Sequence, residues 1–159
     1  MKKLTPKNAK LIAEKYFKRH KEKEGRDFAK VHSGAVAEIA VVLAKKFKAD
    51  ASSVEISGWV HDIGSTVERN NHAVHSLDLL EKEGFEISAL VRDCILNHGT
   101  NGQPKSQEAK ILQMADKLSI LSIPVLKILF SQKSISPYDI EFIDKMTSGA
   151  LDHLKNLAL

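Results

Sequence analysis

The apolar positions of this 159-residue chain recur with helical spacing almost throughout. Within each segment they repeat at intervals of three and four residues, which places them on one face of a helix. No run of alternating Val, Ile, Thr and aromatic residues leads into a hairpin turn. The pattern therefore predicts an all-α fold, a bundle of about six to eight helices with no significant sheet.

Turn and capping residues set the expected bounds of these helices. Thr5 followed by Pro6 is typical of an N-cap and a first helical residue, and Gly25 is typical of a stop. Ser52, three residues before Glu55, predicts a capping box. The helices are expected at 5–25, 27–47, 52–64, 72–83, 88–97 and 106–121, with surface loops at 65–71 and 99–105, an apolar segment at 124–130 and a last helix from 136 to the C-terminus.

Length and composition predict a single domain over residues 1–159. With 43% hydrophobic residues, the chain can form one well-packed core and is too short for two. No segment approaches the roughly 18 to 20 uncharged apolar residues that cross a bilayer, and no export signal follows the Lys-rich N-terminus. We therefore expect a soluble cytoplasmic protein without a membrane partner. The one cysteine, Cys94, is expected to be a small core residue.

The positive charge is concentrated at one end of the chain. The formal net charge is +4, but residues 1–30 hold 11 Lys or Arg against 4 Asp or Glu, an excess of +7. Such a segment can attract nucleic acid or an anionic substrate. The sequence favours the plainer interpretation, a solvated helix face, because the aromatic and glycine motifs of RNA-binding modules are absent. Nucleic acid is therefore not expected as a partner.

Histidines and carboxylates lie among apolar residues in the middle of the chain. Five of the seven histidines fall between residues 32 and 98. His61 and Asp62 adjoin each other in an apolar stretch, and Asp116 is a lone carboxylate in another. Burying such groups without partners costs several kcal/mol, so they are kept inside a domain only when they are paired or bind metal. The pattern predicts a metal site.

Three parts of the sequence together resemble the signature of the HD-domain phosphohydrolase superfamily. They are His32, the segment Val-His-Asp-Ile-Gly at 60–64 and the segment Ala-Asp-Lys-Leu at 115–118. The resemblance covers residues 28–122. It implies a helical bundle of the HD-domain type, with a basic N-terminal helix at 1–26 and C-terminal helices at 123–159 outside the matched part.

The resemblance also implies a set of metal ligands. His32, His61, Asp62 and Asp116 would bind one divalent ion, with His61 and Asp62 acting in catalysis. Members of the superfamily that bind two ions carry two further histidines between the His-Asp pair and the last Asp. In this chain His75 and His98 match those positions, with Asp62 as the bridging ligand, although each taken singly is more typical of a helix surface or a helix end. Mixed His and carboxylate ligation suits Fe, Mn, Zn, Co or Ni better than Mg.

Candidates for substrate binding are Arg69, His72 and Lys117. Arg69 follows the His-Asp motif in an expected loop, where its guanidinium could pair with phosphate oxygens or be a solvated charge. His72 shares a helix face with His75, so it is a substrate contact, an outer-shell residue or the ligand in place of His75. Glu68 is a candidate general acid at a mononuclear site, or a solvated charge. His20 and His153, among charged residues, are expected to be solvated.

The function implied by the resemblance is hydrolysis of a phosphoester or phosphoanhydride bond in a nucleotide-like small molecule by a metal-activated hydroxide. The ligand pattern and short length are similar to small HD enzymes that cleave diadenosine tetraphosphate. Ser65 follows the motif where members that degrade cyclic dinucleotides carry Lys, which argues against that substrate. Two alternatives stay open: a mononuclear 5′-nucleotidase-like enzyme and a non-catalytic module that binds metal or nucleotide. A homodimer through the apolar tail at 120–130 is compatible with the sequence.

Overall fold

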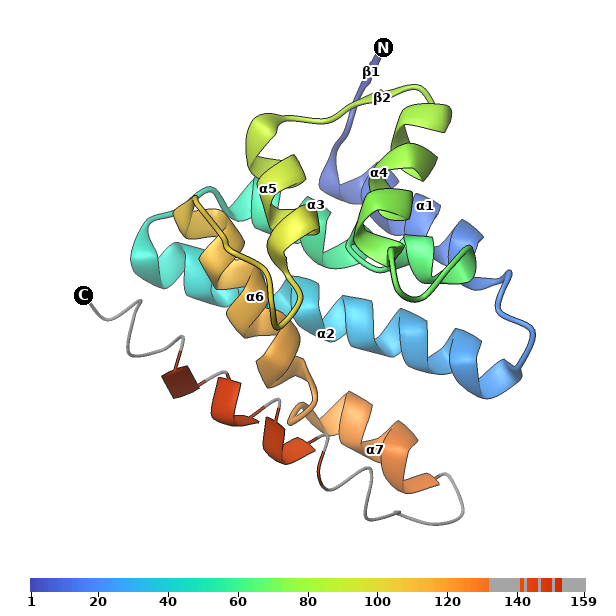
Figure 1. Cartoon of the computed structure of the whole chain (residues 1–159), viewed down its shortest axis with the longest axis vertical. Coiled ribbons are helices and arrows are strands. Elements are labelled where there is room, and N and C mark those ends of the chain that lie inside the picture. The colour runs from blue at the N-terminus through green and yellow to red at the C-terminus, as the bar shows by residue number, and fades with distance from the viewer. Residues whose placement is uncertain (132–140, 142, 146, 150, 153–159) are drawn as a thin grey trace.

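The computed structural model describes residues 1–131, 141, 143–145, 147–149 and 151–152, and in this part of the chain the all-α prediction is confirmed (Figure 1). Most of the last predicted helix, from residue 136, lies outside the described residues. The helices are α1 (Pro6–Phe17), α2 (Lys23–Phe47), α3 (Ala51–Val60), the 3-10 helix η1 (Ile63–Thr66), α4 (His72–Lys82), α5 (Ala89–Asn97), α6 (Gln107–Ser119) and α7 (Ile123–Ser131). Two-residue strands, β1 (Lys2–Lys3) and β2 (Phe85–Glu86), pair in parallel.

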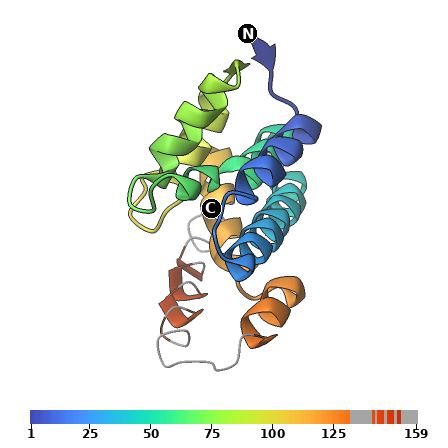
Figure 2. The ribbon, with the colours of Figure 1, turned by 90° about the vertical axis from the view of Figure 1, so that its right-hand side faces the viewer.

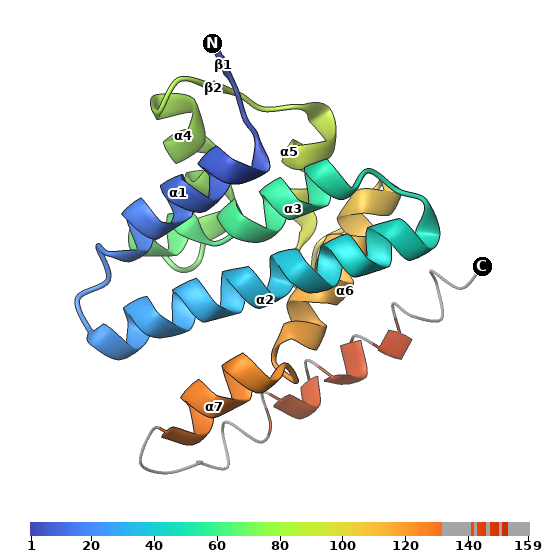
Figure 3. The ribbon, with the colours of Figure 1, turned by 180° about the vertical axis from the view of Figure 1, so that it is seen from behind.

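The helices form two layers around the long helix α2. Figure 3 shows α2 crossing the molecule beside α1 and α3, and Figure 2 shows α4 on the opposite side from this layer. Helices α5 and α6 complete the second layer, and α6 packs directly on α2 and α3. Helix α7 packs against α2 beyond the end of α6. The site described below lies between the two layers.

The contact between α2 and α3 depends on small residues. Ala37, Ala40 and Ala44 on α2 are buried, and Gly58 on α3 faces Ala37. A Cβ atom on Gly58 would lie 2.6 Å from the Cα of Ala37, which is backbone and cannot give way easily. The absence of a side chain at residue 58 therefore lets the two helices approach closely enough to bring His32 and His61 together.

The end of α1 differs from the sequence prediction. The first helix was expected to run to Gly25, but α1 ends at Phe17 and Gly25 lies in the first turn of α2. The guanidinium of Arg26 donates hydrogen bonds to the carbonyl oxygens of His20 and Lys21, at 2.8 and 2.7 Å. These contacts across the link 18–22 stabilise a corner that the apolar pattern did not indicate.

The capping box predicted at Ser52 and Glu55 is also wrong. Helix α3 has Asp50 as its N-cap, and the Asp50 carboxylate accepts hydrogen bonds from the backbone N–H groups of Ser52 and Ser53 at 2.9 and 3.3 Å. An ionised Asp accepts these bonds more strongly than a neutral Ser hydroxyl would, and its charge also suits the positive end of the helix dipole.

The expectation that Cys94 is a core residue is confirmed. Cys94 is fully buried between α2, α3 and α6, and burial raises the pKa of its thiol to about 12.

No described helix is long and apolar enough to cross a membrane.

Replacing Gly58 by Ala is expected to lower the free energy of unfolding by about 1–3 kcal/mol, because the added methyl group meets the backbone of Ala37. The matched control is Gly99→Ala, where no atom lies within 4 Å of the new Cβ and a change within about 0.5 kcal/mol is expected. Urea unfolding of both variants measures the difference, and equal stabilities would contradict the close approach of α2 and α3.

The thiol of Cys94 is expected to react with an aromatic disulfide reagent at pH 8 only after the protein is unfolded. A pKa of about 12 leaves almost no thiolate at that pH, and the surrounding core blocks access. Absorbance during reagent addition, with and without denaturant, measures the reaction. Full labelling of the folded protein within minutes would show that the core around α5 opens readily.

Candidate metal centre

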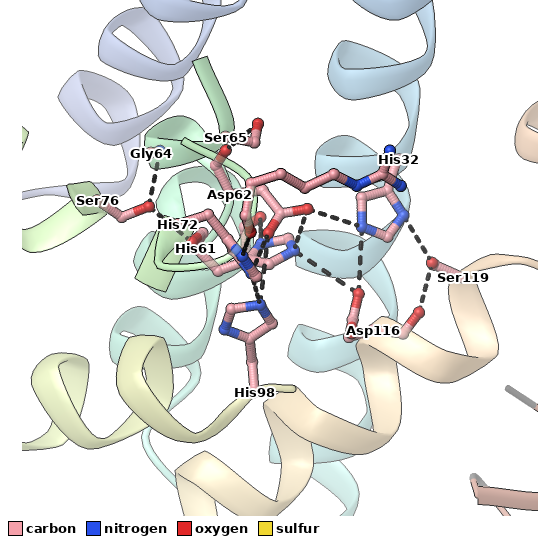
Figure 4. Close-up of polar contacts among 12 residues, drawn as sticks. His32, His61, Asp62, Gly64, Ser65, His72, Ser76, His98, Asp116 and Ser119 are labelled. Carbon is pink, nitrogen blue, oxygen red and sulfur yellow. Dashed lines mark hydrogen bonds and ion pairs between the residues drawn. The ribbon is translucent and has the colours of Figure 1, made fainter. Parts of the chain in front are cut away.

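Six imidazole and carboxylate side chains converge where five elements meet (Figure 4). Three of them belong to residues at helix ends, since α3 ends just before His61, α5 ends just before His98 and α4 begins at His72. The full set is His32 in α2, His61 and Asp62 after α3, His72 in α4, His98 after α5 and Asp116 in α6.

The first group of donor atoms surrounds the carboxylate of Asp116. The Nε2 atom of His32 lies 3.1 Å from Oδ1 of Asp116, and Nε2 of His61 lies 3.6 Å from the same oxygen. Both nitrogens also face Oδ2 of Asp62, at 3.7 Å from His32 and 3.4 Å from His61. The donor atoms of His32, His61 and Asp116 are close enough together to bind one metal ion.

The second group lies on the other side of Asp62. The Nε2 atoms of His72 and His98 are 3.2 and 3.4 Å from Oδ1 of Asp62, the oxygen that does not face His32. The same two nitrogens are only 2.9 Å apart. Two imidazole nitrogens that bind the same ion, each at about 2.0–2.1 Å from it, have a similar separation. The two oxygens of Asp62 thus face two different sets of nitrogen donors.

A repeated hydrogen bond orients three of the histidines. In each, Nδ1 contacts the backbone carbonyl oxygen three residues earlier. The pairs are His61 with Gly58 at 2.9 Å, His72 with Arg69 at 2.7 Å and His98 with Ile95 at 2.7 Å. A carbonyl can only accept, so Nδ1 carries a proton and Nε2 is the nitrogen that faces the centre and can bind a metal ion once it is deprotonated.

His32 reaches the same tautomer through a side chain. The hydroxyl of Ser119 donates to the backbone carbonyl of Asp116 at 2.6 Å and is therefore free to accept from Nδ1 of His32 at 3.0 Å. The Nε2 lone pair of His32 then points toward Asp116 and Asp62. All four histidines are thus oriented as metal ligands usually are, with Nδ1 bonded outside the centre and Nε2 facing into it.

His61 carries the clearest sign that a cation belongs here. Its side chain is fully buried, and its Nε2 atom has no hydrogen-bond partner among the described residues. Burial alone lowers the pKa of His61, but the negative charges of Asp62 and Asp116 raise it well above its ordinary value. Burial likewise opposes ionisation of Asp62, yet His61 and His98 hold the pKa of Asp62 well below its usual range. The centre therefore favours a positive charge next to ionised carboxylates, which fits a metal ion.

The backbone after α3 is shaped by Ser76 and Gly64. The prediction placed the His-Asp pair inside a helix, but α3 ends at Val60 and Asp62 precedes the 3-10 helix η1. The hydroxyl of Ser76 accepts from the N–H of Gly64 at 2.9 Å and donates to the carbonyl of His61 at 2.8 Å. A Cβ on Gly64 would lie 2.0 Å from the carbonyl oxygen of His72. Gly64 thus lets α4 dock against this turn and places His72 beside Asp62.

The structure places His72 in the centre and not His75. The Nε2 atom of His75 lies 3.2 Å from a carboxylate oxygen of Glu68, and its Nδ1 lies 3.7 Å from Asp78. Of the two alternatives that the sequence left open for this helix, the geometry favours His72 as the donor. The sequence held one signal in favour of His72. This residue was expected to begin α4, and side chains on a helix lean toward its N-terminus.

The candidate substrate contacts also divide into residues that line the site and residues that do not. Arg69 and His72 line a pocket of about 600 Å³ beside the centre. Lys117 is not among the residues that line this pocket. Its side chain is buried, its Nζ atom has no hydrogen-bond partner in the described part of the chain, and its pKa is lowered by burial. Glu68, the candidate general acid, does not line the pocket either and instead contacts His75.

One lining residue was missed by the sequence analysis. His20 was expected to be solvated, but it is partly buried and lines the pocket at the corner between α1 and α2. The charged neighbours of His20 in the sequence gave no signal of this position, because it follows from the unexpected end of α1. The other lining residues are Gly25, Phe28, Ala29, His32, Asp62, Ser65, Arg69, His72, His98, Gly99, Thr100, Asp116 and Ile120.

Comparison with known proteins identifies the fold and the relatives of this chain. A crystal structure of a predicted HD superfamily hydrolase from an uncultured Thermotogales bacterium matches with a TM-score of 0.62 and 24% identity, over 96% of this chain and 90% of that one, which shows the shared fold. A deoxyguanosinetriphosphate triphosphohydrolase-like protein from Caldanaerobacter subterraneus is 25% identical over 57% of this chain and 32% of its own length. Ribonuclease Y from Desulforudis audaxviator is 32% identical over 55% of this chain and 17% of its own.

The chain spans about a third or less of the length of these curated relatives. The family model of the HD domain matches residues 29–121, which is more than half of the chain and contains all six converging side chains. The chain therefore belongs to the HD-domain family.

Proposed function

We propose that this protein hydrolyses a phosphoester or phosphoanhydride bond in a nucleotide-like small molecule at a centre of two divalent metal ions. The observation that carries the proposal is the position of Asp62, whose two carboxylate oxygens face separate sets of imidazole donors. The proposed ligands are His32, His61, Asp62, His72, His98 and Asp116. His98, in reach of Asp62, argues against the mononuclear nucleotidase-like alternative.

The residues of the chain have distinct parts in this proposal. When bound, divalent ions lower the pKa of a coordinated water toward neutrality and neutralise phosphoryl oxygens. Asp62, which lines the pocket and is 29% exposed, and the buried His61 would hold the ions that supply this chemistry. Arg69 lines the same pocket and offers a guanidinium to phosphate oxygens. The imidazole and carboxylate donor set favours Fe, Mn, Zn, Co or Ni over Mg.

Pocket size and the relatives support a nucleotide-like substrate. A volume of about 600 Å³ lies in the range of sites for small molecules. The name of the triphosphohydrolase-like relative refers to a nucleoside triphosphate, and the name of the ribonuclease to RNA. Most of the length of both relatives has no counterpart in this chain.

Purified without chelator, the wild-type protein is expected to hold about two transition-metal ions and to turn over one or more of a panel of nucleotides. Asp62→Ala is expected to lower turnover by more than about a hundredfold, since even outer-shell partners of metal ligands are worth 10–100-fold. His72→Ala is expected to retain about one ion. Elemental analysis and phosphate release measure these quantities.

The matched control is His75→Ala, on the same helix but outside the centre, which is expected to keep both ions and wild-type turnover. One ion in the wild type would favour the mononuclear mechanism. Loss of an ion in His75→Ala but not in His72→Ala would reverse the assignment on α4. No turnover after metal reconstitution would leave a binding module.

Metal binding at pH 7 is expected to release about one proton from the protein. The raised pKa of His61 means that the metal-free protein holds a proton there at neutral pH, and a ligand must lose it to bind metal. Metal affinity should therefore increase as the pH rises toward that raised pKa and fall in acid. Calorimetric titration in two buffers of different ionisation enthalpy measures the release, and identical heats in both would contradict a protonated His61.

A further inference from the structure

The pocket extends beyond the metal centre along one face of α2. Gly25, Phe28 or Ala29, and His32 are spaced at i, i+3 or i+4, and i+7, so they lie in line on that face. At a rise of about 1.5 Å per residue, Gly25 lies about 10 Å along the helix from His32. The pocket therefore has a metal end at His32 and a second end at Gly25.

The second end is apolar and lacks a group for phosphate. Ala29 and Ile120 are almost fully buried, and Phe28 stacks on the imidazole of His32 with ring planes 4° apart and centroids 5.5 Å apart. Among the described lining residues, Arg69 is the one Lys or Arg, and it follows the His-Asp motif of the metal end. Apart from Arg69, no described residue that lines the pocket offers a Lys or Arg side chain to further phosphates of an extended polyphosphate chain. A flat, largely apolar group fits this end.

His20 is the polar residue at the second end. Its ring stacks on Phe17, with centroids 6.4 Å apart, and lies against Gly25. Arg26 fixes its backbone through the carbonyl bond described above. Its Nε2 atom is buried and has no hydrogen-bond partner among the residues that the structure describes. Leaving such a group unpaired costs about 1–3 kcal/mol, which a bound molecule can offset.

His20 is suited to a neutral hydrogen bond. Burial lowers its pKa, while the charge of Asp62 acts in the opposite direction. In the neutral form, one ring nitrogen donates and the other accepts, as the edge of a nucleobase or a sugar hydroxyl requires.

We propose that the second end of the pocket is a nucleoside subsite, in which His20 forms a hydrogen bond to the base or sugar while the strip Gly25, Phe28, Ala29 and Ile120 receives its flat apolar part. This proposal rests on the proposed function, because it assigns the phosphate groups to the metal end. It predicts that His20 determines selectivity for nucleotides over substrates that have phosphates but no base.

The test compares a nucleotide with inorganic tripolyphosphate, which has no base. His20→Phe keeps a ring that can stack on Phe17 but removes both ring nitrogens. It is expected to raise KM for the best nucleotide of the panel about tenfold and to leave tripolyphosphate hydrolysis and the melting temperature unchanged. His75→Phe is the matched control outside the pocket and should change neither substrate.

Calorimetric titration with the nucleoside monophosphate of the same base gives a readout that does not require turnover. The His20 substitution should weaken binding about tenfold, also in protein without metal. Equal losses for nucleotide and tripolyphosphate, or no loss for either, would overturn the subsite. If the wild type hydrolysed nothing but bound the monophosphate in a His20-dependent way, the proposed function would fail and the subsite would stand.

Discussion

The burial of His61 beside two ionised carboxylates is the interaction on which the described fold depends most closely. Its Nε2 atom has no hydrogen-bond partner in the described part of the chain, so the centre is built around a place for a positive charge. Helices from both layers contribute imidazole or carboxylate side chains to the centre. The packing of the layers therefore determines the geometry of the donor atoms. The small residues between α2 and α3 act in the same way, because they decide how far His32 stands from His61.

The ends of helices provide much of the organisation around this charge. A helix leaves its last carbonyl groups without partners inside the helix. At the ends of α3 and α5, His61 and His98 use such carbonyls to hold Nδ1, so each helix end is satisfied and each ligand is oriented by one bond. His72 repeats the arrangement with the carbonyl of Arg69 in the preceding loop. The same hydrogen bond, from Nδ1 to the carbonyl three residues earlier, thus occurs three times in a centre whose residues are distant in sequence.

The sequence predicted the parts of the fold that depend on apolar periodicity and local capping. The bounds of α2, α4, α5 and α6 follow from it closely, and His32, His61, Asp62, His98 and Asp116 converge as the family resemblance implies. The choice between His72 and His75 depends on how α4 docks on Gly64, a contact between segments that periodicity does not encode. The corner at His20 depends in turn on the hydrogen bonds of Arg26, and Lys117 was placed wrongly because burial of a Lys has no local signature.

Helix α2 carries both a metal donor and the apolar strip on one rigid face, and this has a consequence for substrate length. If the hydrolysed bond lies at His32 and the recognised group at Gly25, the helical rise sets the distance between them. Side-chain substitutions change what is recognised but leave that spacing intact. Discrimination between short and long substrates of one chemical type is therefore a property of the backbone, and only insertion or deletion of residues between 25 and 32 would alter it.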